Sequence, residues 1–106
     1  MTTENKQLSI RGYIREIDML ETGDTWKKQE FTIVTIEKYP KELRISIWNN
    51  ATEYLLRCKV GDIVICNLNL QSRKYQDKWY SEISAWKVEV DIRAMIEEQK
   101  GGINAN

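Results

Sequence analysis

The chain has 106 residues, which is enough for one domain with one modest hydrophobic core. Lysine plus arginine and aspartate plus glutamate both total 16, so the formal net charge is zero and a binder driven by overall positive charge is excluded. The sequence contains no histidine, which removes the commonest general base and the commonest metal ligand.

Three strands are predicted in the first half of the chain. Residues 1–7 are polar, and we expect them to be disordered. Apolar residues then alternate over residues 7–20, and a change of phase near Arg15 indicates a β-bulge. The turn ETGDT leads to a second strand over residues 26–37, and a turn around the only proline leads to a third over residues 43–48.

The hydrophobic period then changes to that of a helix. The segment NNATEYLLRCKVGD places Ala51, Leu55 and Cys58 at helical spacing. Asn50, with Glu53 three residues later, matches a capping box, and a glycine follows the segment. We therefore predict one short helix after the third strand.

Two further strands are predicted, over residues 63–75 and 78–90, on either side of a turn at Gln76 and Asp77. Alternation in the first of them places four residues in the core: Val64, Cys66, Leu68 and Leu70.

Three aromatic residues of the last strand are also assigned from the pattern. Trp79 and Tyr80 point to opposite faces, so we expect one of them in the core. We expect Trp86 to pack in the core or at an end of the barrel, because aromatic residues fill much of a small core.

The order of the elements predicts an all-β fold, a five-stranded Greek-key OB-fold barrel with one short helix between strands 3 and 4. We place this domain at residues 8–90 and expect residues 91–106 to form a C-terminal tail, partly helical and then flexible. An SH3-like barrel is the main alternative, but it usually lacks the helix. A closed barrel leaves no free sheet edges, so a short antiparallel chain can bury one core.

The cysteine content and the N-terminus indicate where the protein acts. Cys58 and Cys66 form no CxxC pair, and without histidine they cannot complete an ordinary zinc site, so we expect no metal and no cofactor. A disulfide between the two cysteines is possible but unneeded, which favours a reducing compartment such as the cytoplasm. The chain has no apolar run typical of a signal peptide and no segment long enough for a membrane span.

Four segments carry a resemblance to a known family: RISIW, ATEYLL, KVGDIVICNLNLQSRKY and WYSEI. They resemble the second half of bacterial and phage single-stranded DNA-binding proteins. Over most of residues 8–90 the chain also resembles a small uncharacterised OB-like domain family of gut bacteria and their phages, through WKKQEF, YP and WYSEISAWKV. The resemblance implies a role in DNA replication, recombination or repair in the cytoplasm of a bacterial or infected host cell.

The resemblance also implies roles for single residues. The aromatic residue that ends the fourth strand of the relatives and stacks on bases corresponds to Tyr75. Their groove-lining basic residues correspond to Arg44, Arg73 and Lys74. The relatives form oligomers, and an acidic and apolar tail recruits replication or recombination proteins, whereas this chain ends EEQKGGINAN. Their hairpin between the second and third strands is long, whereas EKYPKE is short, so we expect a shorter path for DNA.

The residues themselves suit a nonspecific binder of single strands, which needs cations for phosphates and flat rings on which bases stack. We predict base stacking by Trp26, Trp48, Tyr75 and Trp79. We predict phosphate contacts by Lys27, Lys28, Arg44, Arg73, Lys74 and Lys78. Simpler interpretations remain open, because Trp48 can plug the barrel under the helix and the lysines can be solvated residues that prevent edge pairing. The sequence does not distinguish DNA from RNA.

Other functions are weighed against this one. Asp18, Glu21 and Asp24 gather near the first turn, but the sequence offers no nucleophile motif and no glycine-rich phosphate loop, so we expect a solvated turn and not an enzyme. A sugar-binding OB domain would use rings but would not need the lysines. The serious alternative is a protein-interaction module without nucleic-acid binding, since β-branched residues fall on the outer parity of the strands: Val34, Ile63 and Ile65.

Overall fold

The computed structural model describes residues 8–94 and 96. In chain order its elements are β1 (Leu8–Ile17), β2 (Glu21–Thr22), β3 (Lys27–Thr35), β4 (Glu42–Trp48), the 3₁₀ helix η1 (Asn49–Arg57), β5 (Ile63–Tyr75) and β6 (Lys78–Val90). Residues 92–94 and 96 are helical. The expectations of a disordered N-terminus over residues 1–7 and of a flexible tail over residues 97–106 lie outside the described residues.

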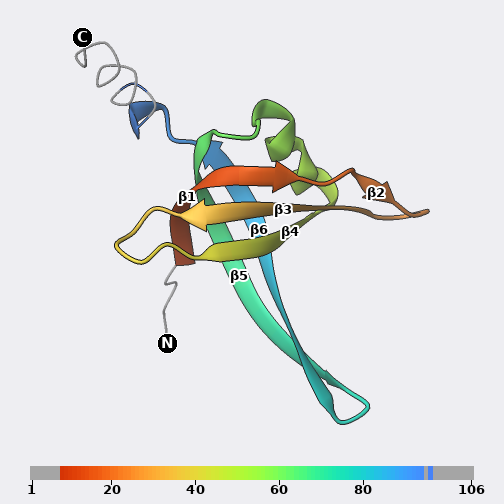
Figure 1. Ribbon diagram of the computed structural model, residues 1–106. Helices are drawn as coiled ribbons and strands as arrows, with labels where there is room; N and C mark the ends of the chain where they lie inside the picture. Colours follow the sequence, from red (N-terminus) through yellow and green to blue (C-terminus); the bar gives the residue numbers. More distant parts are fainter. Residues whose placement is uncertain (1–7, 95, 97–106) are drawn as a thin grey trace, which may run out of the picture.

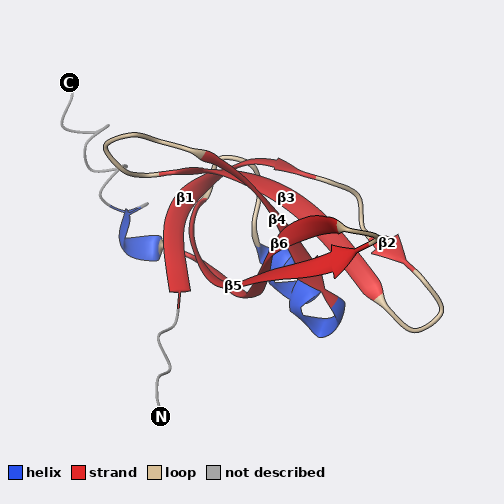
Figure 2. Cartoon of the chain, turned by 90° about the horizontal axis from the view of Figure 1, so that it is seen from below, coloured by secondary structure: helices blue, strands red, loops and turns tan. Residues whose placement is uncertain are grey.

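β1 closes the barrel because it pairs with a strand on each side. It runs antiparallel to β5 and, across a bulge between Ile14 and Glu16, antiparallel to β3. The order β1-β5-β6-β4-β3 completes the ring, and the two-residue β2 is added beside β3 (Figures 1 and 2). The predicted fold class, five main strands in an OB-type barrel with one short helix between the third and fourth of them, is confirmed.

Residues at every second strand position fill the barrel, as the sequence alternation predicts. The largest side chains without exposure are Ile14, Phe31, Ile33, Ile45, Ile47, Val64 and Cys66. Leu55 of η1 packs against this cluster, and η1 contacts β3, β4 and β6. Burial raises the pKa of the Cys66 thiol to about 12, so this cysteine acts as a small apolar core residue.

The start of η1 corrects one prediction. The helix begins at Asn49, whereas the predicted capping box makes Asn50 the N-cap residue. The observed N-cap residue is Trp48, and its side chain makes no capping hydrogen bond. The hydroxyl of Thr52 instead donates to the carbonyl oxygen of Asn49, at 2.7 Å. A 3₁₀ helix has three residues per turn, which explains why Thr52 is buried on the same side as Leu55.

The β5–β6 hairpin leaves the barrel, and this overturns two predictions about its residues. Every residue from position 69 to position 81 is exposed, and the hairpin projects away from the other strands (Figure 1). Leu70 is predicted to be buried but is 64% exposed, because the part of the chain that the structure describes places no second layer over the hairpin. For the same reason Trp79 and Tyr80 are both exposed, at 68% and 51%, although one of them was expected in the core.

The turn of this hairpin has an unusual backbone. Gln76 and Asp77 have φ angles of 50° and 66°, both in the left-handed region. Two-residue hairpin turns of this kind match the twist of the flanking strands, although glycine or asparagine is the usual occupant. The turn therefore fixes the register of β5 on β6, with Tyr75 opposite Lys78.

Trp86 does not take the core position that was one of its two predicted places. Asn67 pairs with Lys87 and Leu68 pairs with Ala85, so Trp86 is the extra residue of a β-bulge in β6. A bulge re-aims the side chain of its extra residue, and the indole of Trp86 is 42% exposed while Ala85 and Val88 are buried. Trp86 is therefore not a core residue.

The double pairing of β1 generates a stability prediction at Gly12, which lies opposite Thr35 of β3 and Val64 of β5. A Cβ atom at this position would lie 2.5 Å from the backbone oxygen of Val34, which cannot move without opening the β1–β3 ladder. We expect Gly12→Ala to lower the free energy of unfolding by roughly 1–3 kcal/mol, measured by urea denaturation.

The matched control is Ser9→Ala, an exposed position on the same strand. It should change stability by less than about 0.5 kcal/mol. Equal stability of Gly12→Ala and the parent protein would contradict the tight closure of the barrel at this point.

Candidate nucleic-acid interface

An open groove of about 710 Å³ lies between the outer side of β3 and β4 and the stem of the β5–β6 hairpin. It exists because β4 and β6 pair only at Ser46–Ser84 and Ile47–Ala85 and diverge on the hairpin side of these pairs (Figure 1). Four of the ten predicted site residues line this one groove: Lys28, Arg44, Trp48 and Arg73.

Two indole rings and an ammonium group form a cluster at one end of the groove. The ring centroids of Trp26 and Trp48 are 6.1 Å apart, and the ring planes are tilted by 59°. The Nζ atom of Lys28 lies 5.3 Å from the centroid of Trp48, a cation–π distance. Trp26 and Trp48 are 41% and 37% exposed, so Trp48 does not plug the barrel and both rings can receive a planar ligand.

Hydrogen bonds fix the orientation of this cluster. The Nε1 atom of Trp48 donates to a carboxylate oxygen of Glu82 on β6, at 3.1 Å. The backbone N–H of Lys27 donates to the side-chain oxygen of Asn49, at 3.0 Å, and so ties the start of β3 to the start of η1. Lys27 and Trp26 also line a neighbouring depression of about 340 Å³. The Trp48 ring is therefore oriented by the protein before any ligand arrives, and the Trp26 ring packs next to it.

Arg44 lies in the groove, but acidic residues already surround its guanidinium group. It donates to the carboxylate of Asp18 and to that of Glu30, the latter at 3.0 Å, and the Thr32 hydroxyl accepts a further bond at 3.1 Å. The hydrogen bond to Asp18 is the main cause of a raised Arg44 pKa, with Glu30 adding to it. A phosphate group must therefore compete with these carboxylates for Arg44.

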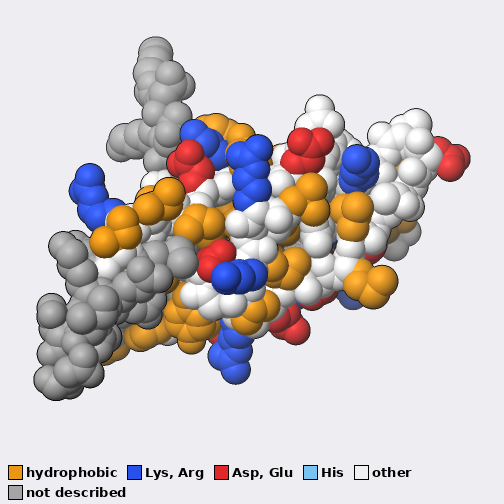
Figure 3. Space-filling view, turned by 90° about the horizontal axis from the view of Figure 1, so that it is seen from above, with side chains coloured by type: hydrophobic (Ala, Val, Ile, Leu, Met, Phe, Trp, Pro, Cys, Tyr) orange, Lys and Arg blue, Asp and Glu red, His pale blue; other side chains and the backbone are white. Residues whose placement is uncertain are grey.

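The groove as a whole carries balanced charge. Its basic residues are Lys28, Arg44 and Arg73, and its acidic residues are Glu30, Glu42 and Glu82. Arg73 is 3.9 Å from a carboxylate oxygen of Glu82. The face of the molecule seen from above in Figure 3 likewise intersperses basic, acidic and apolar side chains. The groove therefore has no excess of positive charge, and its aromatic lining residues are Trp48 and Tyr80.

The remaining predicted residues lie at the tip of the hairpin and divide between its two faces. Tyr75 lies opposite Lys78, and Lys74 lies opposite Trp79. Directly opposite residues of an antiparallel pair share a face, so Tyr75 and Lys78 share the face of Arg73, whereas Lys74 and Trp79 occupy the other face. The structure therefore does not bring Lys74 and Trp79 to the groove.

Tyr39 and Tyr80 are exposed aromatic residues that the prediction of the site did not include. Tyr80 lines the groove directly opposite Arg73, a pairing that follows from a two-residue turn at positions 76 and 77. Tyr39 is 70% exposed in the loop after β3, with the Nζ atom of Lys38 5.4 Å from its ring. The sequence could have indicated the position of Tyr80, because a two-residue turn at positions 76 and 77 places it opposite Arg73. No sequence pattern indicates the loop conformation that exposes Tyr39.

The described residues contain no cluster of cysteine, aspartate and glutamate side chains that could hold a metal ion. Asp18, one of the three acidic residues near the first turn, is engaged with Arg44. Within the described part of the chain, no helix is long and apolar enough to cross a membrane.

The family whose model matches residues 9–89 is described as Domain of unknown function (DUF3127). No curated protein matches the sequence significantly.

Solved structures show the same fold at low sequence identity. The SSB domain of a Synechococcus protein is 15% identical, with a TM-score of 0.65, covering 84% of this chain and 99% of that one. The second single-stranded DNA-binding protein of Mycobacterium smegmatis is 16% identical, with a TM-score of 0.64, covering 85% of this chain and 90% of that one. The dimeric N-terminal domain of PriB from Thermoanaerobacter tencongensis is 21% identical, with a TM-score of 0.62, covering 82% and 97%.

The carboxylate of Glu30 makes the stability of the groove depend on pH. Partial burial acts to raise its pKa, but hydrogen bonds from Arg44 and Lys28 outweigh this and hold the pKa below the ordinary 4.5. A lowered folded-state pKa stabilises the fold above pH 4.5, and this contribution is lost as the pH falls through the lowered value. We expect Glu30→Gln to cost up to about 1 kcal/mol at neutral pH and less at about pH 3, measured by urea denaturation.

The matched control is Glu21→Gln on the exposed strand β2. An equal loss for Glu30→Gln at both pH values would show that the ion pairs of Glu30 do not carry the effect.

Proposed function

We propose that this chain, which belongs to the DUF3127 family, binds single-stranded DNA along the groove between β4 and the β5–β6 hairpin, with little sequence preference. The observation that carries the proposal is the cluster of two part-exposed indoles and an ammonium group, Trp26, Trp48 and Lys28, at the end of that groove. Stacking on such rings contributes about 1–3 kcal/mol per base and accepts any base, because every base has a π face. The fold shared with single-stranded DNA-binding proteins supports the proposal.

The proposed path runs across the outer side of the barrel. Bases stack on Trp48 and Trp26, while Lys28 and Arg73 receive phosphates. Tyr75 and Lys78 lie on the Arg73 face of the hairpin, so they extend the same path toward its tip.

The other predicted residues have secondary places on this path. Lys27 lies beside Trp26 in the neighbouring depression. Lys74 and Trp79 contact a strand only where it wraps around the hairpin, since they occupy its opposite face. Arg44 contributes after a phosphate displaces Asp18.

The proposed role is to protect and present single strands during replication, recombination or repair in the cytoplasm of a bacterium or an infected host cell. This role needs no catalytic group and no cofactor. Partner replication or recombination proteins and a homo-oligomeric state belong to the same proposal, and RNA is the alternative ligand.

The second candidate function is a protein-interaction module, and one surface favours it. Tyr13 lies opposite Val34 on β3 and opposite Ile63 on β5, so the three side chains share the outer face of the barrel wall. Tyr13 is 40% exposed, and Val34, Ile63 and Ile65 are partly exposed. A second copy of the chain or another protein could cover this face.

The proposal is tested by tryptophan fluorescence during titration with oligo-dT at low and moderate salt, with duplex DNA as the control ligand. We expect quenching by the single strand alone and weaker binding as salt increases. The double variant Arg73→Ala, Tyr75→Ala should bind at least about tenfold more weakly with nearly unchanged thermal stability, because both side chains are more than half exposed. Unquenched fluorescence with both oligo-dT and oligo-U would favour the interaction module.

A second prediction follows from the pairing of Arg44. Asp18→Asn removes the carboxylate that competes with phosphate for the guanidinium group. We expect it to raise affinity for oligo-dT about three- to tenfold at low salt, with less gain at high salt. The matched control is Asp24→Asn, an exposed aspartate in the neighbouring turn. An equal gain in both variants would mean that net charge matters and the Arg44 pair does not.

A further inference from the structure

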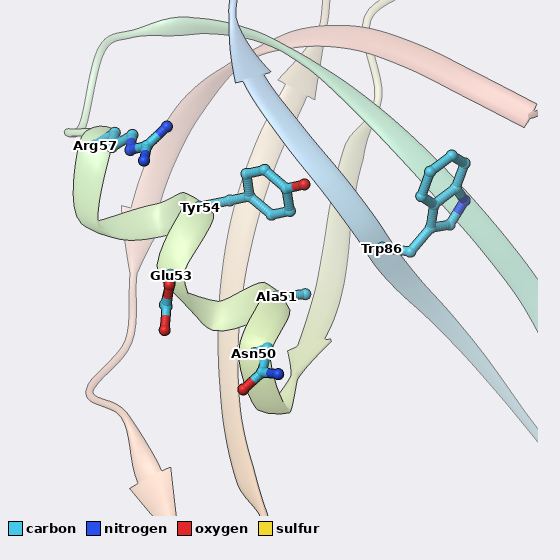
Figure 4. A pocket seen from close by; sticks show the side chains of 6 residues that line it. All are labelled: Asn50, Ala51, Glu53, Tyr54, Arg57 and Trp86. Atoms are coloured by element: carbon cyan, nitrogen blue, oxygen red, sulfur yellow. The ribbon is translucent and has the colours of Figure 1, made fainter.

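A second hollow, of about 480 Å³, lies between η1 and β6, outside the groove described above. Its lining residues are Asn50, Ala51, Glu53, Tyr54, Arg57 and Trp86. In Figure 4, Tyr54 points from η1 toward β6, and Trp86 projects from β6 on the side away from η1. The two aromatic rings of the lining therefore lie on opposite sides of β6.

The exposure of Trp86 is the first reason to assign a ligand to this hollow. The β-bulge turns its indole outward, so the ring does not stabilise the core, and it stays 42% exposed. A large apolar ring held half in solvent by a bulge is a feature of binding surfaces more than of packing.

The hollow continues the proposed path of the single strand. Ile47 on β4 and Ala85 on β6 form a parallel pair, and both are buried. The next residue along each strand, Trp48 and Trp86, is exposed. Asn50 lines both this hollow and the depression that contains Trp26 and Lys27. A strand that passes over Trp48 and the adjacent Trp26 therefore reaches the hollow at Asn50.

The chemistry of the lining suits a nucleotide. The rings of Tyr54 and Trp86 offer surfaces for a base, and the exposed guanidinium group of Arg57 offers a phosphate contact at the same hollow. Asn50 and Glu53 carry polar atoms that can hydrogen-bond to base edges.

We infer that the hollow beside η1 and β6 binds the nucleotides that follow the one stacked on Trp48, with a base against the Trp86 ring and a phosphate on Arg57. This inference rests on the proposed function, because the occupant is the same single strand. It extends the interface from the barrel side onto the helix.

The test compares oligo-dT of increasing length, from about 4 to about 16 nucleotides, on the parent protein and on Trp86→Ala. We expect the parent protein and Trp86→Ala to bind the shortest oligonucleotides with equal affinity. For longer oligonucleotides we expect Trp86→Ala to bind about tenfold more weakly, because one base loses its stacking partner. Arg57→Gln should reduce the slope of log affinity against log salt by about 0.7, the value for one phosphate contact on a single strand. Arg93→Gln, an exposed arginine outside the lining of the hollow, is the matched control and should leave the slope unchanged.

Circular dichroism establishes whether each variant is folded. If Trp86→Ala does not fold, Arg57→Gln alone tests the inference, because Arg57 is exposed. Binding by the parent protein with no effect of either variant at any length would overturn the inference and leave the proposed function intact. An equal loss at every length would also overturn it, because it would not place Trp86 beyond the groove. Absence of binding by the parent protein would overturn both.

Discussion

The pairing of β1 with two strands is the constraint on which the other features depend. Because β1 joins both β3 and β5, the ring is closed on that side, and β4 and β6 need only two parallel pairs to complete it. The short β4–β6 contact in turn lets these strands diverge. The groove, the projecting hairpin and the exposed position of Trp48 are all consequences of that divergence.

The groove combines ordered aromatic rings with basic groups that are already paired with carboxylates. These two properties determine which chemical groups of a ligand the groove could bind. The indoles of Trp26 and Trp48 are fixed by partners in the protein, so stacking a base on them orders few additional groups. The guanidinium group of Arg44 is satisfied by Asp18 and Glu30, so each phosphate contact there replaces an existing ion pair. On the proposed path for a single strand, such a surface would select unpaired bases rather than the backbone of a duplex.

The sequence predicted the fold well because period-two alternation marks which side chains face a common core. It predicted the limits of β5 and β6 and the bulge in β1 for the same reason. It failed at Leu70, Trp79 and Tyr80, because alternation assigns a face but not what covers that face. The partnership of Arg44 with Asp18 joins residues from separate segments, and a local pattern carries no such information.

The same closure has a consequence for the order of folding. The β5–β6 hairpin joins neighbouring residues through a two-residue turn, so its formation restricts only a short loop. The ladder between β1 and β5 joins residues that lie far apart in the sequence, with Leu8 opposite Leu68, and it restricts more than half of the chain before any ring exists. The hairpin should therefore form early and β1 should dock late, so the indole rings of Trp79 and Trp86 stand on a formed hairpin before the chain has an interior.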